Sequence, residues 1–225
     1  MNSDPFAPVL KICGVLADLS KSWYVAGGWA IDLCLQKRRR NHKDVDIAVF
    51  REDQLAAQDY LIERGWKLSK YVGNTVSLEK MQASQLLYLP DRGIRAEPAS
   101  TELPTMDILL SETTEGPGPP AYGAQRNPGE WWYHANSQIT HPLRTIGFST
   151  TIGVPILSPE IVLLFKATHL YGQDADAIRR WQVDDNDFRD IRGLLTPDQR
   201  IWLRRAIAQL YPHHPWLGQL VQGSE

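Results

Sequence analysis

The sequence predicts an α+β protein, in which an N-terminal domain with a mixed β-sheet flanked by helices precedes a C-terminal helical region. Three observations support this prediction. Residues 23–35 have the pattern strand, paired glycines, helix, and residues 44–50 alternate between two faces. Helix-start signals open two segments in the last third of the chain. The expected divisions are a domain at 1–112, a Gly/Pro-rich connector with short strands at 113–157, and a helical domain at 158–225.

The bulk composition is that of an ordinary globular protein. Of the 225 residues, 43% are hydrophobic and 22% are charged, which provides apolar material for a sizeable core. The formal net charge of −2 gives no global positive field toward nucleic acid or anionic lipid. No apolar run approaches the roughly 20 residues that span a bilayer, no leader pattern is visible, and the two cysteines lack disulfide or metal spacing. We therefore expect a cytoplasmic protein.

The first elements follow from hydrophobic spacing. A helix is expected at the start of the chain from apolar residues at helical intervals, namely Val9, Ile12, Leu16 and Leu19. Residues 23–26 are aromatic and β-branched, which favours a short strand. Gly27 and Gly28 stop that strand, and residues 29–35 resume as a helix.

The segment at residues 44–50 predicts a half-buried strand. One face carries valine and isoleucine, while the other carries Asp44 and Asp46, roughly 6–7 Å apart along the strand. A helix is expected at residues 53–64, ended by Gly65. Further strand candidates are residues 66–68, 75–78, 85–89 and 106–110.

The rest of the chain predicts a loop and then helices. Glycine and proline dominate residues 115–128, which favours a loop or connector. Ser158 and Pro159 form a helix start for a run through residue 170. Thr196 and Gln199 form a capping box for another helix, which Pro212 ends.

The paired glycines and the two aspartates together describe a phosphate-transfer site. A strand holds Asp44 and Asp46 rigidly on one face, where carboxylate oxygens can bind Mg²⁺ that also reaches substrate phosphates. Gly27 and Gly28 let the backbone approach a triphosphate closely. The helix that follows presents its positive N-terminal end to such anions.

Two segments, residues 26–32 (AGGWAID) and 40–49 (RNHKDVDIAV), resemble the polymerase β type nucleotidyltransferase superfamily. Their order and spacing are similar to a small bacterial branch, the aminoglycoside and lincosamide nucleotidyltransferases. The likeness covers most of the chain, because it extends to residues 157–167, 184–188 and 212–217. It implies that the first domain is the nucleotidyltransferase catalytic domain.

The resemblance implies nucleotide binding by Gly27 and Gly28, and metal binding and catalysis by Asp44 and Asp46, with two Mg²⁺ ions. A third carboxylate on a neighbouring strand completes such sites, and we choose Asp107 as metal ligand and proton acceptor. An aspartate inside an apolar strand is costly unless it is paired or metal-bound, which independently favours Asp107. The weaker alternatives are Glu97 and Glu102.

Basic residues are the next candidates. The resemblance implies that His42 and Lys43 neutralise the triphosphate and that Lys166 reaches one of its phosphates. Alternatively, the aliphatic part of the Lys166 side chain covers the core and its ammonium group reaches water, as lysines on apolar helices do. Arg38 and Arg39 are expected to be solvated surface residues.

The acidic segment at residues 184–188 has two readings. Asp184 and Asp187 are possible acceptor or nucleotide contacts, or else carboxylates that complement the start of a helix. Related enzymes tend to carry a lysine before this segment where this chain has Val183, so no lysine contact is expected there. Asp32 receives no role, and the aromatic residues 131–133 are expected in the core rather than in an acceptor cleft.

The function implied by the resemblance is Mg²⁺-dependent transfer of a nucleoside monophosphate, AMP by preference, from an NTP such as ATP to a hydroxyl of an aminoglycoside or lincosamide. Aspartates between residues 174 and 190 suit a polycationic acceptor. Two alternatives stay open. One is a toxin-like nucleotidyltransferase that modifies tRNA or protein, and the other is a non-catalytic nucleotide-binding protein on the same fold.

Overall fold

The computed structural model describes residues 4–72, 77–114, 128–171 and 175–221. These residues form two compact units, Met1–Ile156 and Leu157–Glu225. The first contains a mixed β-sheet with helices and the second is helical, so the predicted α+β class is confirmed. None of the helices in the described ranges combines the length and the apolar character that a membrane span needs.

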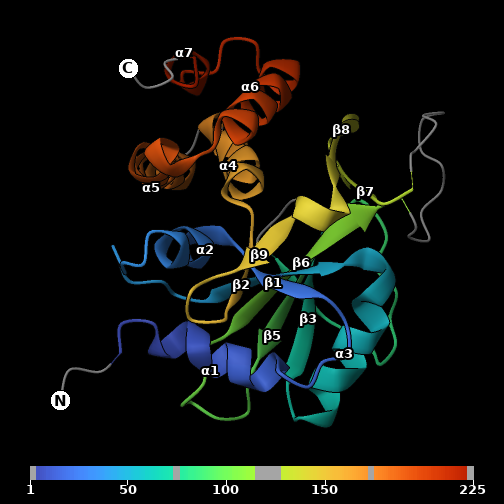
Figure 1. Ribbon diagram of the computed structural model, residues 1–225. Helices are drawn as coiled ribbons and strands as arrows, with labels where there is room; N and C mark the ends of the chain where they lie inside the picture. The colour runs from blue at the N-terminus through green and yellow to red at the C-terminus, as the bar shows by residue number, and fades with distance from the viewer. Residues whose placement is uncertain (1–3, 73–76, 115–127, 172–174, 222–225) are drawn as a thin grey trace. The chain divides into compact units, whose positions relative to one another are not determined.

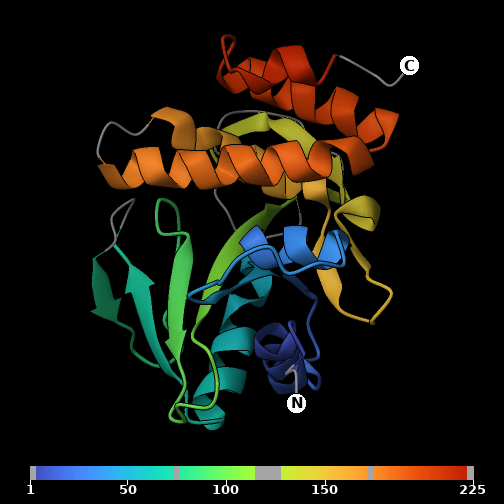
Figure 2. The same cartoon turned by 90° about the vertical axis from the view of Figure 1, so that its left-hand side faces the viewer.

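The first unit is built around a mixed sheet. Its strands lie in the order β4 (Leu78–Lys80), β3 (Lys67–Tyr71), β5 (Gly93–Glu97), β6 (Met106–Thr113), β2 (Val45–Phe50), β1 (Trp23–Val25), β10 (Pro155–Leu157) and β9 (Gly147–Ser149). The first four can be followed across the sheet in Figure 2. β2 and β6 run parallel, whereas β5 is antiparallel to β6. A second branch leaves β6 through β7 (Glu130–Tyr133) to β8 (Asn136–Pro142).

Three helices cover this sheet. α1 (Ala7–Leu16), α2 (Gly27–Cys34) and α3 (Gln54–Glu63) all pack against β2, which therefore lies at the centre of the unit (Figure 1). As predicted, the valines and the isoleucine of β2 are buried while Asp46 is half-buried, but Ala48 on the face of Asp46 is buried as well. The apolar face of β2 anchors the strand in the core and leaves its polar face for a site.

The second unit consists of α4 (Pro159–Ala167), α5 (Ala175–Ile191), α6 (Pro197–Leu210) and α7 (Trp216–Gln219). The predicted capping box at the start of α6 is present. The main-chain nitrogen of Gln199 donates to the Thr196 hydroxyl at 3.3 Å, and the main-chain nitrogen of Thr196 donates to Oε1 of Gln199 at 2.9 Å. Phe188 and Trp216 stack at 4.3 Å between ring centroids in the core of this unit.

Several local expectations are wrong. Residues 85–89 form no strand, because Gln54 satisfies this backbone instead: its Oε1 accepts from the Leu87 amide at 2.7 Å. β5 and α5 were not predicted. The acidic segment at 184–188 lies inside α5, so its reading as a helix start is wrong. All but the last residue of the predicted loop at 115–128 lie outside the described residues.

Candidate active site

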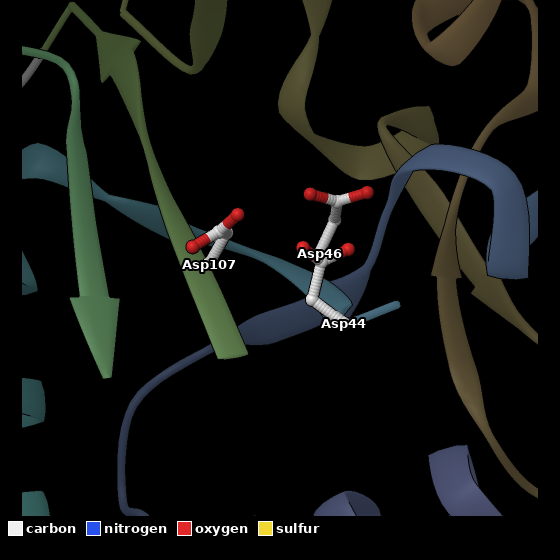
Figure 3. A group of neighbouring side chains, drawn as sticks. All are labelled: Asp44, Asp46 and Asp107. Carbon is white, nitrogen blue, oxygen red and sulfur yellow. The ribbon is translucent and has the colours of Figure 1, made fainter. Parts of the chain in front are cut away.

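Three carboxylates converge at one edge of β2 and β6. Asp44 directly precedes β2, Asp46 lies within it, and Asp107 lies on β6. Asp46 and Asp107 are direct neighbours in the parallel register, so their side chains leave the sheet on the same side. Ligand atoms of all three residues lie within 4.8 Å of one another (Figure 3). We call these three residues the acidic cluster.

The diglycine turn fits tightly against the acidic cluster. Gly27 begins α2 with a φ of +57°, a conformation that favours glycine. A Cβ at Gly27 would collide with the Asp46 carboxylate, and the Ala26 amide donates to the Asp46 carbonyl at 2.8 Å. The Asp46 carboxylate therefore lies at the positive end of α2, where a negative charge is stabilised.

Gly28 leaves space for two basic side chains of this protein. A Cβ at this position would meet the guanidinium of Arg40 and the ring of His42. The sequence reading expected both glycines to make room for phosphates. In the structure they make room first for Asp46 and for these two basic residues.

Arg95 and Tyr71 belong to the site and were missed in the sequence reading. Nη1 of Arg95 donates to Oδ2 of Asp44 at 3.0 Å, and to Oδ1 and Oδ2 of Asp107 at 2.9 and 3.0 Å. The Tyr71 hydroxyl donates to Oδ1 of Asp107 at 2.9 Å. The alternation over residues 94–97, in which Ile94 and Ala96 are buried and Arg95 and Glu97 are more exposed, is the signal that could have revealed this strand.

Burial raises the pKa of two groups at this site, Asp107 and Tyr71. Burial raises the pKa of Asp107, and the hydrogen bonds from Arg95 and Tyr71, which lower it, only partly offset that effect. Burial, followed by the charge of Asp107, raises the pKa of the Tyr71 hydroxyl to about 12. Tyr71 therefore stays protonated at neutral pH and acts as a hydrogen-bond donor.

Asp32 has a structural role that the sequence reading did not provide. It is fully buried, and its carboxylate accepts from Nε of Arg39 at 2.7 Å and contacts Nε2 of His42 at 2.7 Å. Burial alone would raise the pKa of Asp32, but the hydrogen bonds from His42 and Arg39 outweigh it and hold the pKa below its usual value. This network fixes the loop between α2 and Asp44, and the expectation that Arg39 is a solvated surface residue is wrong.

The basic residues predicted to bind the nucleotide lie in different surroundings. His42 is packed between Asp32 and the ring of Trp29, with 4% of its side chain exposed and a ring-centroid distance of 4.3 Å to Trp29. Lys43 is exposed directly beside Asp44. Of these two residues, Lys43 is the more exposed.

Lys166, Asp184 and Asp187 are brought together in the second unit. Nζ of Lys166 lies 2.5 Å from Oδ1 of Asp184 and 2.8 Å from Oδ2 of Asp187, and Nδ1 of His169 lies 2.6 Å from Oδ2 of Asp184. We call these four residues the lysine cluster. The charge and hydrogen bonds of the two carboxylates outweigh the effect of burial and raise the pKa of Lys166, so the lysine is charged.

The remaining candidates lie elsewhere. Glu97 and Glu102 are exposed and are not part of the acidic cluster, which is the single such grouping within the described ranges. The aromatic residues at 131–133 are buried in β7, as the core reading predicted. Three carboxylates on or next to two neighbouring strands provide the hard oxygen donors that Mg²⁺ prefers, so the residues present fit a divalent cation.

The comparisons with known proteins indicate the class of nucleotidyltransferases. A family model described as aminoglycoside-2''-adenylyltransferase matches residues 8–90, a stretch that contains the diglycine turn, Asp44 and Asp46 but ends before Arg95. Together with the likeness in fold to a solved adenylyltransferase structure, this match confirms the predicted resemblance to the nucleotidyltransferase superfamily and the predicted enzyme class. The comparison with curated protein sequences found no match.

Solved structures identify more particular relatives. The chain is similar to the crystal structure of ANT(2'')-Ia in complex with adenylyl-2''-tobramycin, with 15% identity and a TM-score of 0.51 over 90% of this chain and 96% of that one. A solution structure of the antibiotic-resistance factor ANT(2'')-Ia gives the same identity and TM-score over 95% and 98% of the two chains. The lincomycin-bound lincosamide antibiotic adenylyltransferase LnuA matches at 16% identity and a TM-score of 0.48, covering 80% and 95%.

Proposed function

We propose that this protein transfers AMP from ATP, with Mg²⁺, to a hydroxyl group of an aminoglycoside or a similar small antibiotic. The observation that carries the proposal is the convergence of Asp44, Asp46 and Asp107 beside the Gly27 turn. The family match and the likeness to ANT(2'')-Ia support the choice of nucleotide and acceptor.

The three aspartates have separate tasks in this proposal. Asp44 and Asp46 would hold Mg²⁺, which when bound neutralises the phosphate charge and aligns the triphosphate for in-line displacement. Asp107 would complete the ligand set and accept the proton of the acceptor hydroxyl. Burial raises the pKa of Asp107 in the metal-free site.

The bond changes are those of nucleotidyl transfer. The acceptor oxygen forms a bond to the α-phosphorus of ATP, the bond from that phosphorus to the bridging oxygen of pyrophosphate breaks, and the hydroxyl proton passes to Asp107. In this proposal, the main-chain turn at Gly27 and Gly28 and the exposed Lys43 bind phosphate oxygens. Positioning and charge neutralisation supply most of the rate in such a reaction.

The direct test is pyrophosphate release with Mg²⁺, each of the four NTPs, and a panel of aminoglycosides, lincosamides and tRNA. We expect release with ATP and an aminoglycoside. Asp46→Asn should lower turnover by at least about 10²-fold with the far-UV circular dichroism unchanged, because it removes a metal ligand without changing side-chain size.

The matched control is Asp59→Asn, the same chemical change on the exposed surface of α3. It should leave turnover at the wild-type level. Full activity of Asp46→Asn would overturn the proposal, and release with tRNA but with no antibiotic would replace its acceptor.

A further inference from the structure

Arg95 lies in the same row of the sheet as the acidic cluster. It is opposite Asp107 in the antiparallel register of β5 and β6, and Asp107 is in turn beside Asp46. Ile94 and Ala96, on the other face of β5, are buried and fix the strand. The arginine is therefore directed at the carboxylates by the register of three adjacent strands.

The guanidinium of Arg95 lies between the carboxylates of Asp44 and Asp107. One nitrogen, Nη1, lies 2.9–3.0 Å from three oxygens, one of Asp44 and both of Asp107. A divalent ion held by both residues would draw on oxygens of the same two carboxylates. The arginine and a bridging ion therefore compete for one set of oxygen lone pairs.

A second arginine of the same unit shows what a permanent ion pair looks like. Arg51 pairs with Glu112, the two side chains are 4% and 7% exposed, and Nη1 of Arg51 also donates to the carbonyls of Leu87 and Asp91. Arg95 is 21% exposed and Asp44 is 31% exposed, and the hydrogen bonds of Arg95 Nη1 described above end on carboxylates. Releasing Arg95 toward water is consequently much less costly than releasing Arg51.

We infer that Arg95 is the resident cation of the acidic cluster, and that a divalent ion must displace its guanidinium from Asp44 and Asp107 in order to bridge them. The inference rests on the proposed function, because it concerns the metal site of that reaction. The Tyr71 hydroxyl donates to Oδ1 of Asp107 from a different strand, β3, and this hydrogen bond keeps the carboxylate in place during the exchange. Arg95 thus lowers the affinity of the cluster for metal and stabilises the metal-free site.

The test measures Mn²⁺ binding to the full chain without nucleotide, by electron paramagnetic resonance. Arg95→Gln should bind Mn²⁺ at least about tenfold more tightly than wild type, since it removes a unit positive charge next to the ligands. Arg64→Gln is the matched control, because Arg64 lies on the exposed end of α3, and it should bind Mn²⁺ as wild type does. In EDTA, Arg95→Gln should also have a lower Tm than Arg64→Gln, and Mn²⁺ should restore it.

A second measurement needs no variant. In wild type labelled with ¹⁵N at arginine, the side-chain resonance of Arg95 should shift as Mg²⁺ is added, whereas that of Arg51 should not. Unchanged Mn²⁺ affinity in a folded Arg95→Gln, or an Arg95 resonance that ignores saturating Mg²⁺, would overturn the inference.

The two proposals fail in different ways. If wild type binds Mn²⁺ and releases pyrophosphate while Arg95→Gln binds Mn²⁺ no more tightly, only the role of Arg95 is wrong. If neither protein binds Mn²⁺, and Asp46→Asn behaves as wild type, the metal site itself is wrong and the inference is overturned with it.

Discussion

The acidic cluster and the lysine cluster both contain aspartates that contact a basic side chain, and they differ in how far these aspartates are exposed. In the acidic cluster, the Asp44 and Asp107 side chains are 31% and 15% exposed, and one arginine contacts both. In the lysine cluster, Lys166, Asp184 and Asp187 are 9%, 6% and 2% exposed and contact each other directly. The first arrangement leaves carboxylates accessible to a cation, whereas the second encloses a lysine between two carboxylates.

The pKa shifts of Asp107 and Asp184, one carboxylate from each cluster, have opposite directions. Burial raises the pKa of Asp107, because its partners only partly offset the loss of water. At Asp184, burial also acts to raise the pKa, but hydrogen bonds from His169 and the charge of Lys166 outweigh it and lower the pKa. A carboxylate whose charge is poorly compensated is suited to take up a metal or a proton. A carboxylate whose charge is fully compensated is suited to hold the fold together.

The largest effect that tests this contrast is expected at Lys166. Lys166→Met leaves two buried carboxylates without their ammonium and should lower the free energy of unfolding by about 3–5 kcal/mol. Urea unfolding followed by circular dichroism measures it, with exposed Lys67→Met as the control. An unchanged midpoint together with a raised KM for ATP would assign Lys166 to phosphate binding instead.

The next effect concerns Asp32, the buried carboxylate that supports the loop before Asp44. Asp32→Asn weakens two charge-assisted hydrogen bonds and should cost about 1–3 kcal/mol of stability. Thermal unfolding in EDTA measures this cost without metal. Asp59→Asn should show no change, and an equally stable Asp32→Asn would contradict the role given to this network.

A smaller effect is expected at the diglycine turn. Gly27→Ala forces the Asp46 carboxylate to move and should weaken Mn²⁺ binding about tenfold. Gly65→Ala is a close control, because Gly65 also has a positive φ, of +79°, but has open space around its Cβ position. Both variants should lose some stability through backbone strain, and only Gly27→Ala should lose metal affinity.

The smallest effect is a pH dependence. The folded-state pKa of Asp184 is lowered, so its stabilising contribution is present above its ordinary value of 3.8 and is lost as the pH falls below that value. The difference in unfolding free energy between wild type and Asp184→Asn should therefore be full at pH 6 and shrink as the pH falls below about 3.8. A difference that stays constant to lower pH would contradict this direction.

Much of the fold follows from local patterns, and the exceptions have a common cause. Hydrophobic alternation predicted β2, and Thr196 with Gln199 predicted the start of α6, because both signals come from neighbouring residues. β5 and α5 were missed. The residues of α5 are predominantly polar, so hydrophobic spacing gives a weak signal for this helix. The alternation of β5 is a local signal, but it is short. The side chain of Gln54 satisfies the backbone near Leu87, a contact over 33 positions that removes the need for a strand there.

The sequence by itself determined the enzyme class, the helix and strand that hold the diglycine turn, and the acidic face of β2, because these depend on short-range spacing and on a short recognisable motif. Only the tertiary structure decided that Asp107 meets Asp44 and Asp46, that Arg95 lies between two of them, and that Asp32 holds the preceding loop. These contacts depend on the register between strands and on burial, which join residues far apart in the chain. The side chains that carry a charge are visible in a sequence, but the partner that compensates each charge is chosen by the fold.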